Sequence, residues 1–248
     1  MIYNENCIET IKRFDNKSID GIITSPPYNI SVKRKDNYYN NGYADIDCLS
    51  EEDYLNKRIE EFIGFSRILK DNGVILYNIS YSKNSPMLPL LLMNKVHNET
   101  DLTVVDIISW KKKTSLPLQS SKNRLSRIVE LIYVIVKKSD VDTFNTNKKV
   151  TKINKRTGQK FYKKYVNFIE ADNNDGFKSE LKACFSQHLV GELIRIYFPA
   201  NSKIYDPFIG IGTTALACID NGCYYIGSEI NKNFFNIAIN RIMKRVSL

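Results

Sequence analysis

The sequence predicts an α/β fold built around one mainly parallel sheet. Short apolar runs alternate along the chain with segments whose apolar residues recur at helical spacing. Turn motifs such as Ser-Pro-Pro and Asp-Asn-Gly separate the two kinds of segment. Strands that alternate with helices form parallel sheets covered by helices on both faces. The 248 residues, 43% hydrophobic and 25% charged, are enough for one large domain of this class or two small ones.

Seven apolar runs are expected to form the strands. They cover residues 2–4, 20–24, 74–79, 103–110, 128–136, 203–206 and 224–229. A capping-box pattern at Ser50 begins a long helix, which the Asp-Asn-Gly turn at residues 71–73 ends. A helix is also expected to begin at Ser85 and Pro86, because proline is favoured in a first turn. Further helices are expected at residues 185–198, 213–221 and 233–244.

Two regions do not fit this alternation, and they set the expected boundaries. Residues 31–48 are polar, with basic and tyrosine side chains, and are expected to form a long loop. Residues 139–183 are rich in Lys, Asn and Asp and are expected to form a small inserted lobe. The chain is then divided into residues 1–138, the insert, and residues 184–248, and the two outer parts form one domain.

The positive charge is concentrated in one part of the chain. The net charge is +9, from 36 Lys and Arg against 27 Asp and Glu. Residues 111–182 carry 18 basic and 7 acidic residues, a net of +11, and the rest carries 18 and 20, a net of −2. A nearly neutral body with one basic segment suggests a surface that contacts a polyanion such as nucleic acid. A solvated charged surface is the alternative.

Composition argues against several classes of protein. Five scattered cysteines without a Cys-x-x-Cys spacing, and only two histidines, predict neither a disulfide framework nor a metal site. No apolar run has the length of a membrane span, and the first residues show no signal-peptide pattern. We therefore expect a cytoplasmic protein that holds no metal and does not bind a membrane.

A Ser-Pro-Pro-Tyr motif, formed by Ser25, Pro26, Pro27 and Tyr28, directly follows a predicted strand. The two prolines fix their φ angles and have no backbone donors, so the turn is stiff and rich in carbonyl acceptors. With the Ser25 hydroxyl and the Tyr28 ring, it suits a planar group that carries an exocyclic amine. A rigid turn at the end of a strand is the structural alternative.

A second motif, Asp206 to Thr214, lies between a predicted strand and helix and contains Gly210 and Gly212. These glycines let a ligand approach the backbone beside a helix N-terminus. Glu229 ends the next predicted strand, where an acid can accept both hydrogen bonds of a ribose diol. The motif therefore predicts a site for an adenosine-containing cofactor, with a merely tight strand–helix turn as the alternative.

Together the two motifs resemble those of the amino-methylating DNA methyltransferases of bacterial modification systems. The order, Ser-Pro-Pro-Tyr before the glycine motif, is similar to the circularly permuted β arrangement of that family. The resemblance extends from Ile2 to about Arg245, apart from the basic insert. It implies a seven-stranded sheet with one antiparallel strand, a small basic target-recognition insert, S-adenosylmethionine as cofactor, and a base flipped out of double-stranded DNA.

The resemblance also implies roles for individual residues. The motif from Ser25 to Tyr28 would hold the target base and accept the hydrogens of its amine. The cofactor residues implied by the family pattern are Asp206, Phe208, Gly210, Gly212 and Thr213 on the methionine side, Glu229 at the ribose, Phe185 on the adenine and Asn6 as a further adenine contact. Phe185 is followed by serine, whereas the family commonly has Phe-Pro.

The target atom is predicted from one residue. In this family Ser-Pro-Pro-Tyr is more usual for cytosine N4 and Asp-Pro-Pro-Tyr for adenine N6, so Ser25 favours cytosine N4 and leaves adenine N6 open. An RNA methyltransferase is a further alternative. The intact motifs argue against a non-catalytic nucleic-acid-binding module.

The expected DNA-contacting residues are basic side chains near the catalytic motif and at the start of the basic segment. They are Lys33, Arg34, Lys111, Lys112, Lys113, Arg124 and Arg127. Base-reading side chains are expected within residues 139–183. The loop at residues 31–48 would close over the flipped base or fill the gap, with a flexible surface loop as the alternative. A cognate restriction endonuclease acting on the same site is an expected partner, and the protein is expected to be a monomer or a homodimer.

Overall fold

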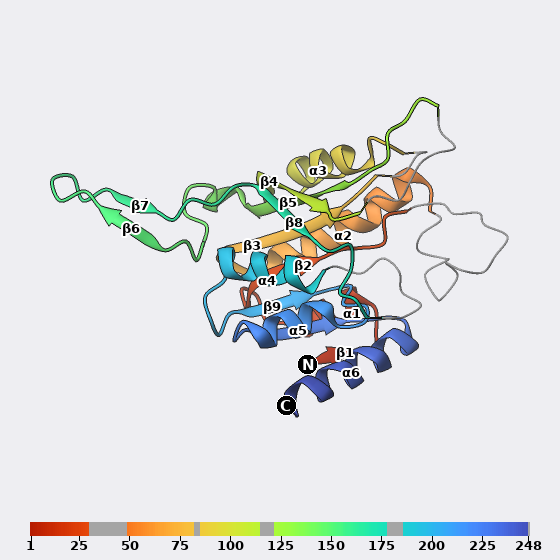
Figure 1. Cartoon of the computed structure of the whole chain (residues 1–248). Helices are drawn as coiled ribbons and strands as arrows, with labels where there is room; N and C mark the ends of the chain where they lie inside the picture. The colour runs from red at the N-terminus through yellow and green to blue at the C-terminus, as the bar shows by residue number, and fades with distance from the viewer. Residues whose placement is uncertain (30–48, 82–84, 115–121, 178–185, 248) are drawn as a thin grey trace.

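A twisted sheet runs through the centre of the molecule and is covered by helices on both faces (Figure 1). The structure is a computed structural model that describes residues 1–29, 49–81, 85–114, 122–177 and 186–247. In order across the sheet, its eight strands in the described residues are β1 (Ile2–Tyr3), β10 (Tyr224–Ser228), β9 (Lys203–Asp206), β2 (Ile19–Thr24), β3 (Leu69–Ile79), β5 (Val129–Lys137), β4 (Leu102–Lys112) and β8 (Phe168–Ala171).

The strand directions confirm the predicted α/β class. Within the described residues every strand of this sheet runs the same way except β5, which is antiparallel to both of its neighbours. The prediction of seven strands was wrong by one. The extra strand, β8, lies in the region expected to be a separate lobe and pairs with β4, Ser109 opposite Phe168. Four residues at a sheet edge are too few to give a periodic signal in the sequence.

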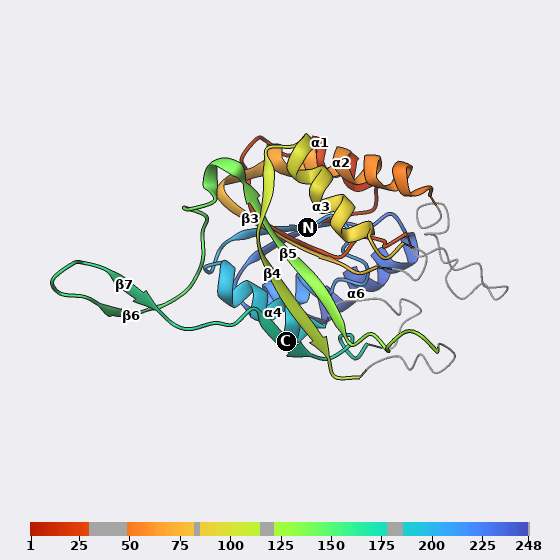
Figure 2. The same cartoon turned by 90° about the horizontal axis from the view of Figure 1, so that it is seen from above.

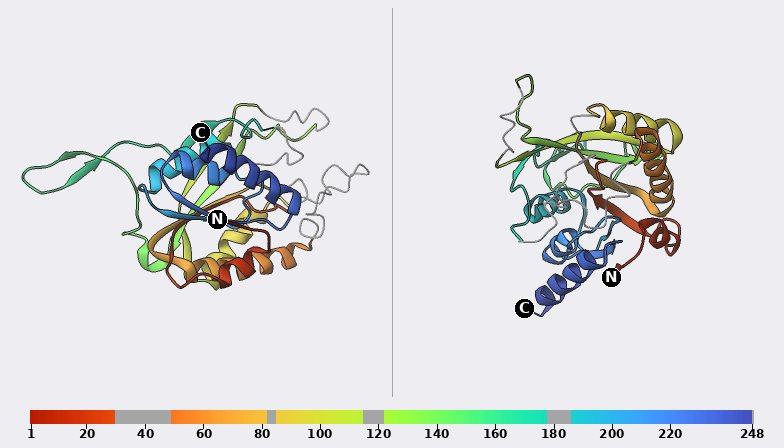
Figure 3. Two further views of the ribbon diagram at one scale, coloured as in Figure 1. Left: turned by 90° about the horizontal axis from the view of Figure 1, so that it is seen from below. Right: turned by 90° about the vertical axis from the view of Figure 1, so that its right-hand side faces the viewer.

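Two layers of helices enclose the sheet (Figures 2 and 3). One layer contains α1 (Cys7–Lys12), α2 (Glu51–Ile68) and α3 (Leu88–Glu99), and the other contains α4 (Gln187–Tyr197), α5 (Thr213–Asp220) and α6 (Lys232–Val246). Alternate residues of β3 serve the two layers, because successive side chains point to opposite faces. Val74 and Leu76 pack in the core under α4, and Ile75 and Tyr77 pack in the core under α2. No helix in the described part of the chain has the length and apolar character needed to cross a membrane.

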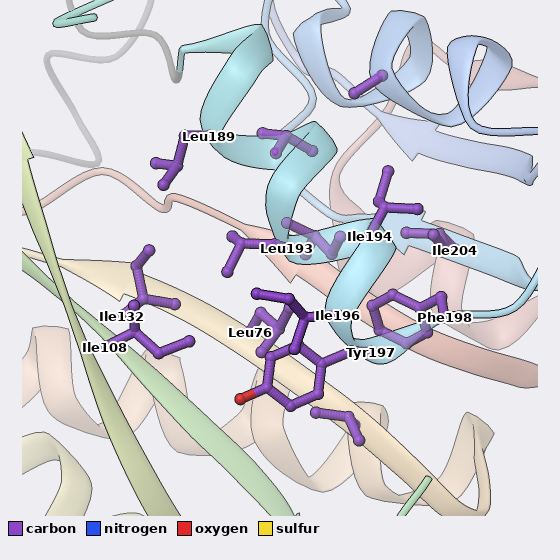
Figure 4. Close-up of a cluster of buried hydrophobic side chains, with 14 of the residues drawn as sticks. Leu76, Ile108, Ile132, Leu189, Leu193, Ile194, Ile196, Tyr197, Phe198 and Ile204 are labelled. Atoms are coloured by element: carbon purple, nitrogen blue, oxygen red, sulfur yellow. The ribbon is translucent and has the colours of Figure 1, made fainter. Parts of the chain in front are cut away.

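The helix α4 packs its apolar face on the sheet (Figure 4). Leu189, Leu193 and Ile194 are at most 1% exposed and lie in one cluster with Leu76. Burial of each such side chain stabilises the fold by about 1.5–3 kcal/mol. Phe198 belongs to the same cluster, and its ring lies against Gly21. A Cβ added to Gly21 would lie 2.1 Å from that ring. Gly21 therefore leaves the space that the ring occupies.

Most element boundaries follow the sequence, with local differences. Ser50 caps α2 as predicted, and its hydroxyl accepts a hydrogen bond from Asp53 N at 3.1 Å. The helix ends at Ile68, before the Asp-Asn-Gly turn, because β3 already begins at Leu69. Helix α3 begins at Leu88, later than expected, with Pro89 in its first turn. Helix α1 was not predicted, since six residues are too short to show helical periodicity.

The expected insert runs along the strand direction, from the side of the sheet where the parallel strands begin to the side where they end. It begins within the 3-10 helix η1 (Lys138–Asp140). The strands β6 (Val150–Ile153) and β7 (Lys160–Tyr162) form a hairpin, the arm, that projects from the body (Figures 1 and 2). Asn145 N and Asn147 N donate to Asn72 O and Ile196 O, which holds the base of the arm at the edge where the parallel strands begin. The chain then returns through β8 to the edge where they end. Residues 178–183 of the expected insert lie outside the described residues.

One carboxylate joins the two halves of the sheet. Asp206 ends β9 and is 2% exposed. Its Oδ1 accepts hydrogen bonds from Thr24 Oγ1 at 2.7 Å and Phe208 N at 3.0 Å, and its Oδ2 accepts one from Thr214 Oγ1 at 2.6 Å. Burial raises the pKa of Asp206 to about 6, while these three hydrogen bonds act in the opposite direction. The carboxylate thereby fixes the end of β2 to the turn that follows β9 and to helix α5.

We expect Asp206→Ala to lower the free energy of unfolding by about 3 kcal/mol or more, because it leaves three buried donors without an acceptor. Asp206→Asn should cost only about 1 kcal/mol, since its amide oxygen still accepts from Thr24 and Phe208. Urea unfolding of both variants and the native protein measures the difference. Equal losses in the two variants would contradict this account.

The buried carboxyl group also predicts a pH dependence. Its pKa of about 6 lies above the ordinary value of 3.8, so the folded protein binds this proton more tightly than the unfolded chain. The stabilisation is fully present below about pH 4 and is lost as the pH rises through about 6. The stability of the native protein relative to Asp206→Asn should therefore fall between these pH values and stay constant above them. A constant difference from pH 4 to pH 7 would contradict the prediction.

Candidate active site

The site lies where neighbouring parallel strands end. Strands β2, β9 and β10 are adjacent and parallel, so the residues that follow them meet at one edge of the sheet. Ser25 follows β2, Phe208 follows β9 and Glu229 follows β10. The chain leaves β2 toward β3 on one side and β9 toward β10 on the other, and ligands of open α/β sheets bind at such a reversal.

A pocket opens at this edge, and its volume of about 370 Å³ includes space that is open to solvent. Three of the predicted cofactor residues, Asn6, Phe208 and Glu229, line it together with Pro27 of the Ser-Pro-Pro-Tyr motif. The pocket therefore touches both sequence motifs. Its other lining residues are Glu5, Cys7, Lys57, Arg58, Glu61, Pro207, Ser228 and Ile230.

The remaining predicted cofactor residues shape the turn behind the pocket. Gly210 N donates to Glu229 Oε2 at 3.0 Å. Gly212 has a φ of 86°, and an added Cβ would lie 3.1 Å from Ala238 Cβ, so glycine is required there. Glu229 Oε1 accepts a hydrogen bond from Asn231 N at 2.7 Å. Two backbone N–H groups therefore hold the Glu229 carboxylate in the pocket lining at the end of β10.

Thr213 has a partner that the sequence did not indicate. Its Oγ1 donates to Asp175 Oδ2 at 2.7 Å, and Arg241 Nη2 lies 2.6 Å from the same oxygen. The Asp175 side chain is fully buried. The end of the insert is thus fixed to the glycine turn. Phe185 lies outside the described residues.

A hydrogen-bonded network surrounds the Ser-Pro-Pro-Tyr motif. Ser25 Oγ and Tyr28 Oη are 2.7 Å apart, and Tyr28 Oη donates to Glu130 Oε2 at 3.2 Å. Asn78 Nδ2, on β3, donates to Tyr28 Oη at 2.5 Å and to Glu130 Oε2 at 3.0 Å. Lys112 Nζ donates to the other oxygen of Glu130 at 2.5 Å. Strands β3, β4 and β5 therefore bring three polar side chains to the motif.

The network sets the direction of its protons. Burial, followed by the Glu130 carboxylate, raises the pKa of Tyr28 well above its ordinary value, so the phenol keeps its proton. When that proton points to Glu130, the Ser25 hydroxyl donates to Tyr28 Oη. Asn78 Nδ2 occupies one acceptor site of Ser25 Oγ at 3.3 Å. A hydroxyl oxygen has two lone pairs, so Ser25 keeps one for a ligand donor.

The carbonyl groups of the turn are only partly engaged. Pro27 O accepts a hydrogen bond from Tyr54 Oη at 2.8 Å. Within the described parts of the chain, no donor reaches the Pro26 carbonyl. After the turn, the Asn29 amide exchanges two hydrogen bonds of 3.0 Å with the Leu49 backbone. These bonds join the two ends of the segment at residues 30–48, which lies outside the described residues along with Lys33 and Arg34.

The predicted DNA-contacting residues of β4 and β5 cluster at the same edge, where three lysines are paired with carboxylates. Lys111 pairs with Glu170 at 2.5 Å and Lys113 with Asp172 at 2.8 Å. Lys112 pairs with Glu130 and also lies over the Trp110 ring, at 4.8 Å from the centroid. Arg127 donates to Tyr81 O and lies over the Tyr81 ring at 4.9 Å, and Arg124 is exposed.

Sequence reasoning missed the polar residues that lie within apolar segments. Asn78 and Glu130 lie in runs predicted as buried strands, and Arg58 and Glu61 lie three residues apart on the apolar face of a predicted helix. A polar side chain inside such a run, or an opposite-charge pair at helical spacing, was the available signal. The partners of these residues come from distant segments and are not evident from local patterns.

Comparisons with known proteins agree with this geometry. A family model described as DNA methylase, for N6 and N4 methyltransferases, matches residues 19–240. Type II methyltransferase M.SmaI of Serratia marcescens is 24% identical over 96% of this chain and 88% of its own length. Type II methyltransferase M2.MboI of Moraxella bovis is 26% identical over 97% of this chain and 86% of its own length.

Solved structures share the fold. PvuII DNA methyltransferase (cytosine-N4-specific) has a TM-score of 0.74 at 17% identity, covering 97% of this chain and 85% of that one. The complex of M1.HpyAVI with SAM has a TM-score of 0.63 at 23% identity, covering 98% of both chains. S-adenosylmethionine, the cofactor that the sequence predicts, agrees with the family match. Because that match covers most of the chain, the protein belongs to the N6/N4 DNA methylase family.

Proposed function

We propose that this protein transfers the methyl group of S-adenosylmethionine to the exocyclic N4 of a cytosine flipped out of double-stranded DNA. The observation that carries the proposal is the position of Ser25, whose hydroxyl has a spare acceptor site beside the pocket that Pro27 lines. The same reaction on adenine N6 is the second candidate, because the family includes both targets.

The pocket residues fit the proposed cofactor. Glu229, held by two backbone N–H groups, lies in the pocket lining where the ribose would bind, and Phe208 and Asn6 line the same pocket. Gly210 and Gly212 keep the turn close to Glu229 and α6, and Asp206 and Thr213 hold the turn from behind. When bound, S-adenosylmethionine supplies a methyl group activated by a positively charged sulfur.

Ser25 and Pro26 orient the amine of the target base. The free lone pair of Ser25 Oγ accepts one amine hydrogen, and the Pro26 carbonyl, which has no donor among the described residues, accepts the other. With both hydrogens held, the nitrogen lone pair points to the methyl donor, and the acceptors stabilise the positive charge that develops on the nitrogen.

The network beyond Ser25 provides a path for the departing proton. Ser25 Oγ gives its proton to Tyr28 Oη as it takes one from the amine, and Tyr28 gives its own to Glu130 Oε2. Lys112 and Asn78 hold the Glu130 carboxylate in position. Glu130 is thereby the terminal proton acceptor of the described network.

The neutral serine supports cytosine N4, and a solved structure of the same fold is named as cytosine-N4-specific. The restriction-modification setting is proposed from relatives named type II methyltransferases, with a cognate endonuclease as expected partner.

For the domain organisation we propose one methyltransferase domain formed by residues 1–138 and 184–248 and interrupted by a DNA-binding insert at 139–183. We further propose that base-reading side chains lie within residues 139–183 and that the arm contacts flanking phosphates.

The direct test is methyl transfer from labelled S-adenosylmethionine to unmodified bacterial DNA, followed by digestion to nucleosides and mass spectrometry. N4-methylcytosine is the expected product. N6-methyladenine would overturn the choice of base while keeping the reaction. No incorporation into DNA, with label appearing in RNA, would overturn the choice of nucleic acid.

Ser25→Ala should lower kcat by about 100-fold, because it removes an acceptor that acts on the charge formed during transfer. Tyr28→Phe and Glu130→Gln should each lower kcat by about 10-fold or more through loss of the proton path. DNA binding, measured by fluorescence anisotropy, should be retained in all three variants. Ser18→Ala, at the opposite end of β2, is the control. Full activity in Glu130→Gln would exclude the proton path.

The arm should contribute DNA affinity but little to the chemical step. Residues 148–164 contain eight basic and no acidic residues: Lys148, Lys149, Lys152, Lys155, Arg156, Lys160, Lys163 and Lys164. Replacing Lys152, Lys155, Arg156 and Lys160 with Gln should reduce the slope of log affinity against log salt by about 3.6, since each phosphate contact contributes about 0.9. The kcat at saturating DNA should not change. Replacing Lys12, Lys17, Lys70 and Lys95 with Gln is the charge-matched control, and an equal loss of slope there would rule out the arm.

A further inference from the structure

An arginine that sequence reasoning did not identify lies in the wall of the pocket. Arg58, on α2, is fully buried and lines the pocket together with Pro27 and Phe208. Its guanidinium carbon lies 5.1 Å from the centroid of the Tyr54 ring and 5.0 Å from that of the Phe208 ring. Contacts with these rings fix the position of the guanidinium group.

The hydrogen-bond donors of Arg58 are largely unused. Its Nη2 lies 2.7 Å from Glu61 Oε1, within ion-pair distance. None of the three guanidinium nitrogens has a hydrogen-bond partner among the described residues, and neither has Glu61 Oε2. A guanidinium group carries five N–H donors, and leaving such donors unpaired in a buried site is costly. The donors of Arg58 therefore lack acceptors in the described wall of the pocket.

Charge favours an anion at this place. Burial raises the pKa of Glu61 to about 7, with Arg58 opposing the shift, whereas arginine stays protonated. Arg58 therefore stays positively charged, while burial disfavours the charged form of Glu61. The other acidic lining residues are engaged elsewhere: Glu5 pairs with Arg13 at 2.8 Å, and Glu229 accepts backbone N–H groups.

We propose that Arg58 binds the α-carboxylate of the methionine portion of S-adenosylmethionine. The inference rests on the proposed function and adds one binding residue to it. That carboxylate is the single anionic group of the cofactor, and arginine commonly binds carboxylates through two parallel hydrogen bonds. Arg58 touches the ring of Phe208, which belongs to the glycine motif, so the amino-acid end would lie against α2 while Glu229 takes the ribose.

The test compares two ligands that differ only in this group, S-adenosylmethionine and its decarboxylated form. Their affinities are measured by calorimetry for the native protein and for Arg58→Met combined with Glu61→Gln, a pair that leaves no lone buried charge. We expect the double variant to bind S-adenosylmethionine about 10- to 100-fold more weakly, as for loss of charged hydrogen bonds. Its affinity for the decarboxylated form should change by less than about 3-fold.

Arg58→Lys provides a second variant that keeps the buried cation if the double variant does not fold. Lysine cannot form the paired bonds of a guanidinium, so the preference for the carboxylated ligand should again fall. Arg67→Lys, on the same helix but outside the pocket lining, is the matched control and should keep the full preference. Circular dichroism of each variant checks the fold independently of activity.

The outcomes separate this inference from the proposed function. An unchanged preference in the Arg58 variants, or an equal loss of affinity for both ligands, would overturn the role of Arg58. In either case methyl transfer to DNA by the native protein would leave the proposed function standing. A native protein that binds neither ligand would overturn both.

Discussion

The structure depends on the carboxylate of Asp206. It accepts hydrogen bonds from the last residue of β2, from the turn after β9 and from the first turn of α5. The last residue of β2 is more than 180 residues away from the other two segments along the chain, yet the site requires all three to keep one relative position. A buried carboxylate is costly to desolvate, as its raised pKa indicates, and three donors are needed to offset that cost. The Ser-Pro-Pro-Tyr turn is thus held to the glycine turn by a group that does not itself line the pocket.

The polar groups at this edge form two separate sets. One set surrounds Ser25 and links it through Tyr28 to Glu130. The other lies in the pocket and combines the Glu229 carboxylate, held by two backbone N–H groups, with the buried guanidinium of Arg58. Pro27 lies between them, since it lines the pocket and its carbonyl accepts from Tyr54. Tyr54 also lies against Arg58, so α2 supports both sets from one helical face. This arrangement brings a donor of methyl groups and an acceptor amine to one edge without mixing their binding groups.

Sequence patterns predicted the parts of the fold that local chemistry determines. The strand before Ser25, the strand before Asp206 and the Ser50 cap all depend on short-range alternation or capping, and each was found within a residue of its expected place. The pairing of β8 with β4 and the meeting of Asn78 with Glu130 depend on register between distant strands. Both side chains face the same edge only because β5 runs antiparallel to β3. Composition and periodicity carry no information about that register, so the motif was predictable and its supporting network was not.

The insert is joined to the rest of the chain at two points. Its first part leaves the edge where the parallel strands begin, and its last part is fixed by the buried ion pair of Asp175 with Arg241. A buried ion pair adds little stability by itself, but separating its partners leaves an unpaired buried charge. The pair therefore favours a single docked position of the insert. Thr213 donates to the same carboxylate, which connects that position to the turn behind the pocket. The docked position of the insert and the conformation of the glycine turn are therefore linked through the Asp175 carboxylate. The arm, at the opposite edge, has no such link to the pocket among the described residues.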